Sequence, residues 1–126
     1  MRKSQHQKDY SYLKQMLFYA NEVEESLAKV KKYGIPLDDE MVISALAMQI
    51  GQIGEQLGAD KLSSECQERY ADRIPFRAIK GFRNRAYHDY GSMRTRIIIE
   101  TATVQVPHLI GELEDILSNF SDEIKD

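Results

Sequence analysis

Residues 83–90, which read Arg-Asn-Arg-Ala-Tyr-His-Asp-Tyr, combine an imidazole with guanidinium groups. The imidazole of His88 titrates near neutral pH, so it can take a proton from one oxygen and return it to another. The guanidinium of Arg83 can stabilise the charge that builds up on a phosphate. In RNA the ribose 2′-OH supplies the nucleophile, so cleavage needs no serine, cysteine or metal-bound water from the protein. The segment is therefore a candidate for phosphodiester cleavage, and the alternative is a surface histidine on a basic helix.

Charge is unevenly distributed along the sequence. The chain contains 17 Lys and Arg and 20 Asp and Glu, a net charge of −3. Residues 73–96 contain seven Lys and Arg and one Asp, a local charge of +6, so the rest of the chain carries −9. A basic window can bind phosphate while the acidic remainder limits indiscriminate binding. Arg77, Lys80 and Arg85 are therefore candidates for RNA binding, and the alternative is a solvated basic helix face.

Other kinds of site are not supported by the sequence. The lone Cys66 excludes a disulfide framework and a multi-thiolate metal site. His108 and Glu112 share a helix face but supply only two metal ligands, so we predict no metal and no cofactor. No apolar run approaches the roughly 18 residues of a membrane span, and no apolar signal region follows the first residues. We expect a cytoplasmic protein with no membrane partner.

The spacing of apolar residues predicts that helices position the basic segment. Steps of three and four residues recur over 13–30 and again over 43–57, which is typical of helices packed in a bundle. Gly34 can end the first helix, and Asp38 or Asp39 can cap the second. We expect these two helices to form an antiparallel hairpin.

Small residues form a strip along another face of the second predicted helix: Ala47, Gly51, Gly54 and Gly58. Glycine is unfavourable inside a helix but permits close approach of another backbone. Either another helix of this chain or a second chain is expected to pack there.

The basic segment is predicted to lie on a helix between two others. Ser64 and Gln67 form a plausible capping box for a short helix that ends near residue 72. Pro75 suits the first turn of the next helix, which carries the basic segment as far as Tyr90. Gly91 can end that helix in a left-handed turn.

The last predicted helix spans the apolar positions from Ile99 to Phe120, whose period of about 3.5 residues outweighs the strand propensity of its first part. Ser92 can cap this helix and Pro107 should kink it. We therefore predict an all-α bundle that forms one domain over residues 1–126, in which residues 121–126 fray.

Arg83 and His88 do not point the same way on a straight helix, because five residues separate their directions by about 140°. Three explanations remain open. The helix distorts, or Arg83 pairs with an acid in a structural role, or the site is composite and groups from two chains meet across a two-fold axis.

At residues 83–90 the sequence resembles the HEPN superfamily, and within it the HepT-type toxins. Their motif of Arg, four residues, His, one residue and Tyr is matched by Arg83, His88 and Tyr90, with Asn84 in the polar position. The likeness includes residues 53–55 and the lead-in 75–84, and it spans roughly residues 41–90. Two aromatic positions in the lead-in depart from the pattern, since phenylalanines stand where Trp and Met are expected.

The resemblance implies an antiparallel bundle of four to five helices that forms a homodimer, with the motifs of both chains lining one basic cleft. It implies a metal-independent endoribonuclease in which His88 is the general acid and base. Arg83 would orient or stabilise the scissile phosphate, and Asn84 would hold the motif or the RNA.

The resemblance also implies a type VII-like toxin–antitoxin pair, in which a minimal nucleotidyltransferase antitoxin transfers AMP to Tyr90. The added phosphate would compete with RNA for the same arginines. A core tyrosine is the alternative for Tyr90. Two further functions stay open, a non-catalytic binding subunit of a nucleotidyltransferase complex and a nucleic-acid-binding regulator without turnover.

Overall fold

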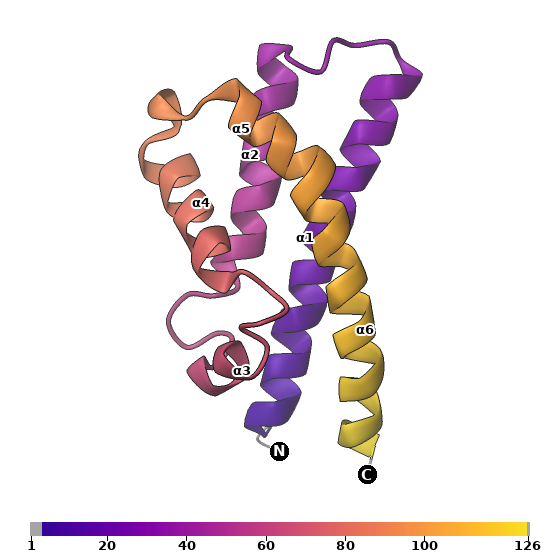
Figure 1. The fold of residues 1–126 in the computed structure, drawn as a ribbon, viewed down its shortest axis with the longest axis vertical. Coiled ribbons are helices and arrows are strands. Elements are labelled where there is room, and N and C mark those ends of the chain that lie inside the picture. Colours follow the sequence, from indigo (N-terminus) through magenta and orange to yellow (C-terminus); the bar gives the residue numbers. More distant parts are fainter. Residues whose placement is uncertain (1–3, 126) are drawn as a thin grey trace.

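The protein is all-helical in the computed structural model, which describes residues 4–125 (Figure 1). Its elements are α1 (Gln5–Lys32), α2 (Glu40–Glu55), α3 (Ser64–Arg69), α4 (Phe76–His88), a 3-10 turn (Tyr90–Ser92), α5 (Thr95–Glu100), a π-helical segment (Thr101–Gln105) and α6 (Val106–Lys125). No strand occurs in the described part of the chain. The predicted all-α fold is confirmed.

Three long helices enclose the core. α1 and α2 form the expected antiparallel hairpin, and α6 runs beside α1 (Figure 1). The buried side chains come from the predicted apolar positions of all three helices, among them Leu13, Leu46, Ile53, Leu113 and Phe120. None of the described helices is long and apolar enough to cross a membrane.

The turn between α1 and α2 follows the sequence prediction. Tyr33 is the C-cap of α1, and Gly34 follows it with φ +65°, the left-handed conformation that favours glycine. Asp39 caps α2, because its carboxylate accepts hydrogen bonds from the N–H groups of Met41 and Val42. Of the two aspartates proposed as the cap, Asp39 is therefore the one used.

α3 begins at Ser64, so its N-cap lies one residue before the predicted cap. The N-cap is Ser63 rather than Ser64, and its hydroxyl accepts a hydrogen bond from the N–H of Cys66. Ser63 is held at the cap position because its N–H and hydroxyl also donate to the buried carboxylate of Asp9 on α1, at 2.9 and 2.7 Å. This contact fixes α3 against the first turns of α1.

The glycines of α2 let α4 lie against it. A Cβ on Gly54 would come within 2.5 Å of Arg83 Cβ and 2.9 Å of the carbonyl oxygen of Ile79. A Cβ on Gly51 would come within 2.8 Å of the Tyr87 ring. At these two glycines the strip of small residues is occupied by α4 of the same chain, so it gives no support to a contact with a second chain.

The last helix is one run of helical backbone from α5 to α6, interrupted in its hydrogen-bond pattern by the π segment that precedes Pro107. Its predicted cap is wrong. The N-cap is Arg94, and the hydroxyl of Ser92 instead donates to Asp89. Ile98 rather than Ile99 is the fully buried residue at its start. The side chains of residues 121–126, where fraying is predicted, lie outside the described part.

Candidate active site

α4 carries the basic segment but ends earlier than the sequence suggests. Helical backbone stops at His88, because Asp89 adopts a non-helical conformation with φ −150° and ψ 37°. Gly91 does not have the left-handed conformation expected of it. Tyr90 therefore lies off the helix, at the start of the 3-10 turn, and not on its apolar face.

Arg83 lies on the flank of α4 that faces α2, where it pairs with an acid. Its Nε and Nη2 donate to the same carboxylate oxygen of Glu55, at 2.7 and 2.5 Å. Its Nη1 donates to Oδ1 of Asn84 at 3.0 Å, and the guanidinium carbon lies 5.0 Å from the centre of the Tyr87 ring. The side chain is only 29% exposed. Of the three explanations, the pairing of Arg83 with an acid is therefore observed, and that acid is Glu55.

The hydrogen bonds from Arg83 hold the pKa of Glu55 below its ordinary value, and Lys61 at 3.6 Å lowers that pKa further. Glu55 is thus a carboxylate at neutral pH and fixes the guanidinium in one orientation. One N–H on each of Nη1 and Nη2 has no acceptor among the described residues. Arg83 can therefore hold its acid and still donate to a phosphate.

His88 is the last residue of α4 and its side chain is exposed. Among residues 4–120 its ring has no hydrogen-bond partner, so both nitrogens are accessible to a substrate. α4 is regular from Phe76 to His88, so helix distortion does not bring Arg83 and His88 together. One chain supplies both groups but aims them in directions about 140° apart.

The two tyrosines of the segment occupy different environments. The hydroxyl of Tyr87 is buried without a hydrogen-bond partner among the described residues, and burial followed by the charge of Glu55 raises its pKa. Tyr90 is 39% exposed, and its hydroxyl forms a 3.0 Å hydrogen bond with Ser44 of α2. Tyr90 is therefore an accessible surface tyrosine, and the core-tyrosine alternative is wrong.

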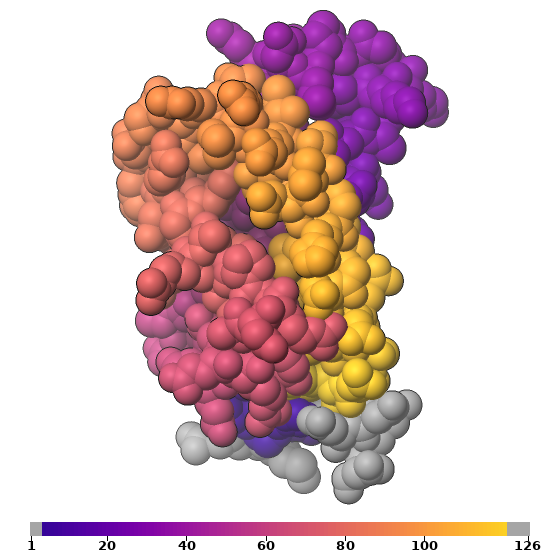
Figure 2. Space-filling model, viewed as in Figure 1, coloured from indigo at the N-terminus to yellow at the C-terminus, as the bar shows by residue number. Residues whose placement is uncertain are grey.

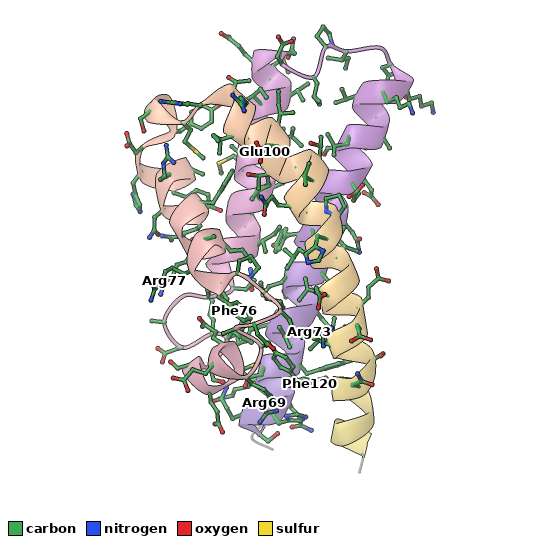
Figure 3. The ribbon with its side chains drawn as sticks, in the orientation of Figure 1. Arg69, Arg73, Phe76, Arg77, Glu100 and Phe120 are labelled. Carbon is green, nitrogen blue, oxygen red and sulfur yellow. The ribbon has the colours of Figure 1, made fainter. Side chains whose placement is uncertain are left out.

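The candidate RNA-binding side chains of α4 are exposed: Arg77, Lys80, Asn84 and Arg85. Arg77 points away from the helices (Figure 3). Not every charge in the basic window is available, because Arg73 donates to Glu112 and Asp115 of α6 at 2.6 and 2.7 Å. Arg73 thus attaches the loop before α4 to α6 instead of serving the site.

Arg85 lies on the flank of α4 opposite Arg83, where it lines an apolar groove of about 410 Å³. The groove is a hollow between α4 and the helix from α5 to α6 (Figure 2). Its walls are mostly aliphatic, with Phe82 on α4 and His108 at the rim. Neither Arg83 nor His88 lines the groove. The groove is therefore separate from the basic face, by which we mean the exposed side of α4 that carries Lys80, Asn84 and His88.

Metal-ligating side chains do not cluster in the described part of the chain, where no group of three or more His, Cys, Asp or Glu lies together. Glu112, which could have joined His108 as a ligand, is bound by Arg73. Cys66 is buried, which raises the pKa of its thiol to about 12 and keeps it protonated.

The profile of the family described as "Ribonuclease HepT-like" matches residues 16–116, which include the whole basic segment. The chain belongs to this family. It is also 29% identical over 79 residues to "Putative RNase TTE0752" of Caldanaerobacter subterraneus subsp. tengcongensis, covering 63% of this chain and 68% of that relative. No solved structure gives a significant match. The resemblance to the HEPN superfamily drawn from residues 83–90 is thereby confirmed.

Two interactions of this HepT-like chain were not predicted from residue types alone. Glu55 belonged to the segment that resembles the family, but the sequence did not indicate that it binds Arg83. Its position one turn after Gly51, between Gly54 and Gly58 of the small-residue strip, is the signal that could have placed it beside α4. Nothing in the sequence pointed to Ser44 as the partner of Tyr90.

Proposed function

We propose that this chain is a metal-independent endoribonuclease. His88 takes the proton of the ribose 2′-OH and returns one to the leaving oxygen, while Arg83 stabilises the negative charge on the scissile phosphate. The observation that carries the proposal is the hydrogen bonding of the Arg83 guanidinium group. Its guanidinium is oriented by Glu55 and Asn84, yet keeps N–H groups for a phosphate on a basic face of a HepT-like fold.

The test is RNA cleavage by wild type, His88→Ala and Arg83→Ala, each purified in EDTA and checked for helix content by circular dichroism. We expect cleavage by wild type, and at least a hundredfold loss in both variants with the helix signal kept. A requirement for a divalent ion would contradict the metal-independent route. Binding of RNA by wild type without cleavage would favour the non-catalytic binding subunit.

A second copy of the chain is proposed to complete the site. Arg83 and His88 of one chain face different directions, so a two-fold axis beside α4 would let Arg83 of one copy act with His88 of the other. An exposed apolar strip on α2 supports this arrangement, since Met41 and Met48 are 82% and 51% exposed on either side of Ser44. Tyr90 borders that strip through its bond to Ser44.

Control by a nucleotidyltransferase is also proposed, in the manner of a type VII-like toxin–antitoxin pair. A minimal nucleotidyltransferase antitoxin would transfer AMP to the hydroxyl of Tyr90, releasing pyrophosphate from ATP. The exposure of Tyr90 supports this assignment over Tyr87, whose hydroxyl is buried. The added phosphate and nucleoside would occupy the basic face and exclude RNA.

A further inference from the structure

A polar hollow of about 490 Å³ lies beside the N-terminal half of α4, between the first turns of α1 and the loop that follows α2. Three lysines from three different segments line it: Lys8 of α1, Lys61 of the loop and Lys80 of α4. Among the described residues that line it, Asp60 alone carries a carboxylate. The hollow is therefore positively charged in a chain whose net charge is −3.

Lys80 belongs both to this hollow and to the exposed stripe of α4. Lys80, Asn84 and His88 are spaced four residues apart, so they follow one another along nearly the same side of the helix. Eight residues of helix place Lys80 about 12 Å from His88. A nucleic-acid strand whose bases are stacked as in a duplex advances by about 3.4 Å per nucleotide, so an RNA strand that stays stacked covers this distance in three or four nucleotides.

A series of charged side chains joins the hollow to Arg83. Lys61 lies 3.6 Å from Glu55, and Glu55 accepts both hydrogen bonds from Arg83. Lys61 is 36% exposed and pairs with Glu55 at 3.6 Å. Ion pairs at this exposure are weak, so a phosphate can compete with Glu55 for the ammonium group.

We infer that the hollow formed by Lys8, Lys61 and Lys80 binds a backbone phosphate of single-stranded RNA, three or four nucleotides from the bond that is cut. This inference rests on the proposed ribonuclease function. Ammonium groups bind phosphates as point charges and read no base edges, so the subsite fixes the register of the RNA without selecting its sequence. RNAs too short to reach the hollow are poorer substrates.

The test uses one RNA whose cut has been mapped, truncated from each end one nucleotide at a time. With wild type, kcat/KM falls by about three- to tenfold when the nucleotide that reaches the hollow is removed, which is the effect of losing two exposed ion pairs. The variant Lys8→Ala/Lys61→Ala should show no such fall in kcat/KM, because it cleaves the long RNA no better than the truncated one. Lys29→Ala/Lys31→Ala removes two exposed charges from the far end of α1 and keeps the wild-type fall in kcat/KM. An equally large fall in kcat/KM on truncation in Lys8→Ala/Lys61→Ala would overturn the inference.

A binding measurement separates this inference from the ribonuclease proposal. His88→Ala, alone and combined with Lys8→Ala/Lys61→Ala, is titrated with the full-length labelled RNA over a range of salt concentrations. The slope of log K against log salt becomes shallower by about 0.7 for each phosphate that the protein no longer neutralises. This result holds even if wild type cuts no RNA. Unchanged slopes would refute the RNA subsite. If the slopes are unchanged and inorganic phosphate stabilises only the protein with intact lysines, the hollow binds free phosphate instead.

Discussion

Arg83 of α4 places two N–H groups on a single oxygen of Glu55 of α2, although 28 residues separate them in the sequence. Both side chains are about a quarter to a third exposed, so the pair is neither buried in the core nor fully solvated. A pair in this position restricts the guanidinium without neutralising all of its donors. Glu55 is therefore a positioning residue for the proposed reaction.

Replacement of Glu55 by Gln tests this role. The amide oxygen can still accept one hydrogen bond, but the charge that orients Arg83 is lost. We expect kcat for RNA cleavage to fall by about tenfold or more with a smaller change in KM, since a slightly misplaced catalytic group costs this much. The matched control is Glu65→Gln on α3, an exposed glutamate. Higher activity in Glu55→Gln would instead mean that the pair withholds Arg83 from the substrate.

The same pair predicts how stability depends on pH. The pKa of Glu55 is lowered in the folded protein, first by the hydrogen bonds from Arg83, so the unfolded chain takes up this proton at a higher pH. The stabilisation is fully present above about pH 4.5 and is lost as the pH falls through the lower folded value. Urea unfolding at pH 5 and pH 3 should show about 1 kcal/mol less acid destabilisation in Glu55→Gln than in wild type. Equal losses in the two proteins would show that the pair contributes nothing to the acid response.

Gly54→Ala should separate α2 from α4. The new methyl group would overlap Arg83 Cβ and the Ile79 carbonyl oxygen, and the backbone atom cannot move away by rotating a side chain. We expect a loss of about 1–3 kcal/mol in the free energy of unfolding, together with reduced cleavage. Gly81→Ala is the control, because nothing lies within 4 Å of its Cβ and alanine favours the helix. A neutral Gly54→Ala would mean that the packing between the two helices adapts easily.

Complementation tests whether two chains share one site. Arg83→Ala and His88→Ala are each expected to be inactive. Random mixing makes half of the dimers heterodimers. If Arg83 of one copy acts with His88 of the other, each heterodimer has one intact site and one site that lacks both groups. The mixture should then show about a quarter of wild-type activity. If each chain forms its own site, the mixture stays inactive. Sedimentation at micromolar concentration checks that dimers form.

The exposure of Tyr90 predicts where AMP is attached. Co-expression with a cognate nucleotidyltransferase, followed by peptide mass spectrometry, should find AMP on Tyr90 and none on Tyr87, whose hydroxyl lies against Gly51. Tyr90→Phe should stay toxic in the presence of the nucleotidyltransferase. Protection of cells that carry Tyr90→Phe would refute the assignment.

The periodic features of this chain were predictable and the interactions between distant elements were not. Apolar spacing was sufficient for the long helices, and the glycines of α2 marked a close approach, because both depend on local geometry. The cap at Ser63 rather than Ser64 depends on Asp9, which lies in another helix. The end of α4 before Tyr90 depends on the backbone conformation of Asp89. The partner of Arg83 required knowledge of how α2 and α4 are paired.

The hydrogen bonds between Asp9 and Ser63 also bear on the order in which the protein folds. α3 has only six residues, too few to persist as an isolated helix, and the carboxylate that fixes its N-cap, Ser63, lies 54 positions earlier in the chain. Closing a loop of that length costs about 3.5 kcal/mol of chain entropy, so this end of the molecule is expected to form late and to open first. Lys8 is next to Asp9 in the sequence and Lys61 is two residues before Ser63, so these bonds are expected to help bring the two lysines together. A partly synthesised or partly unfolded chain would therefore lack the lysine-lined hollow proposed to bind RNA. Full binding of RNA would begin only once folding is complete.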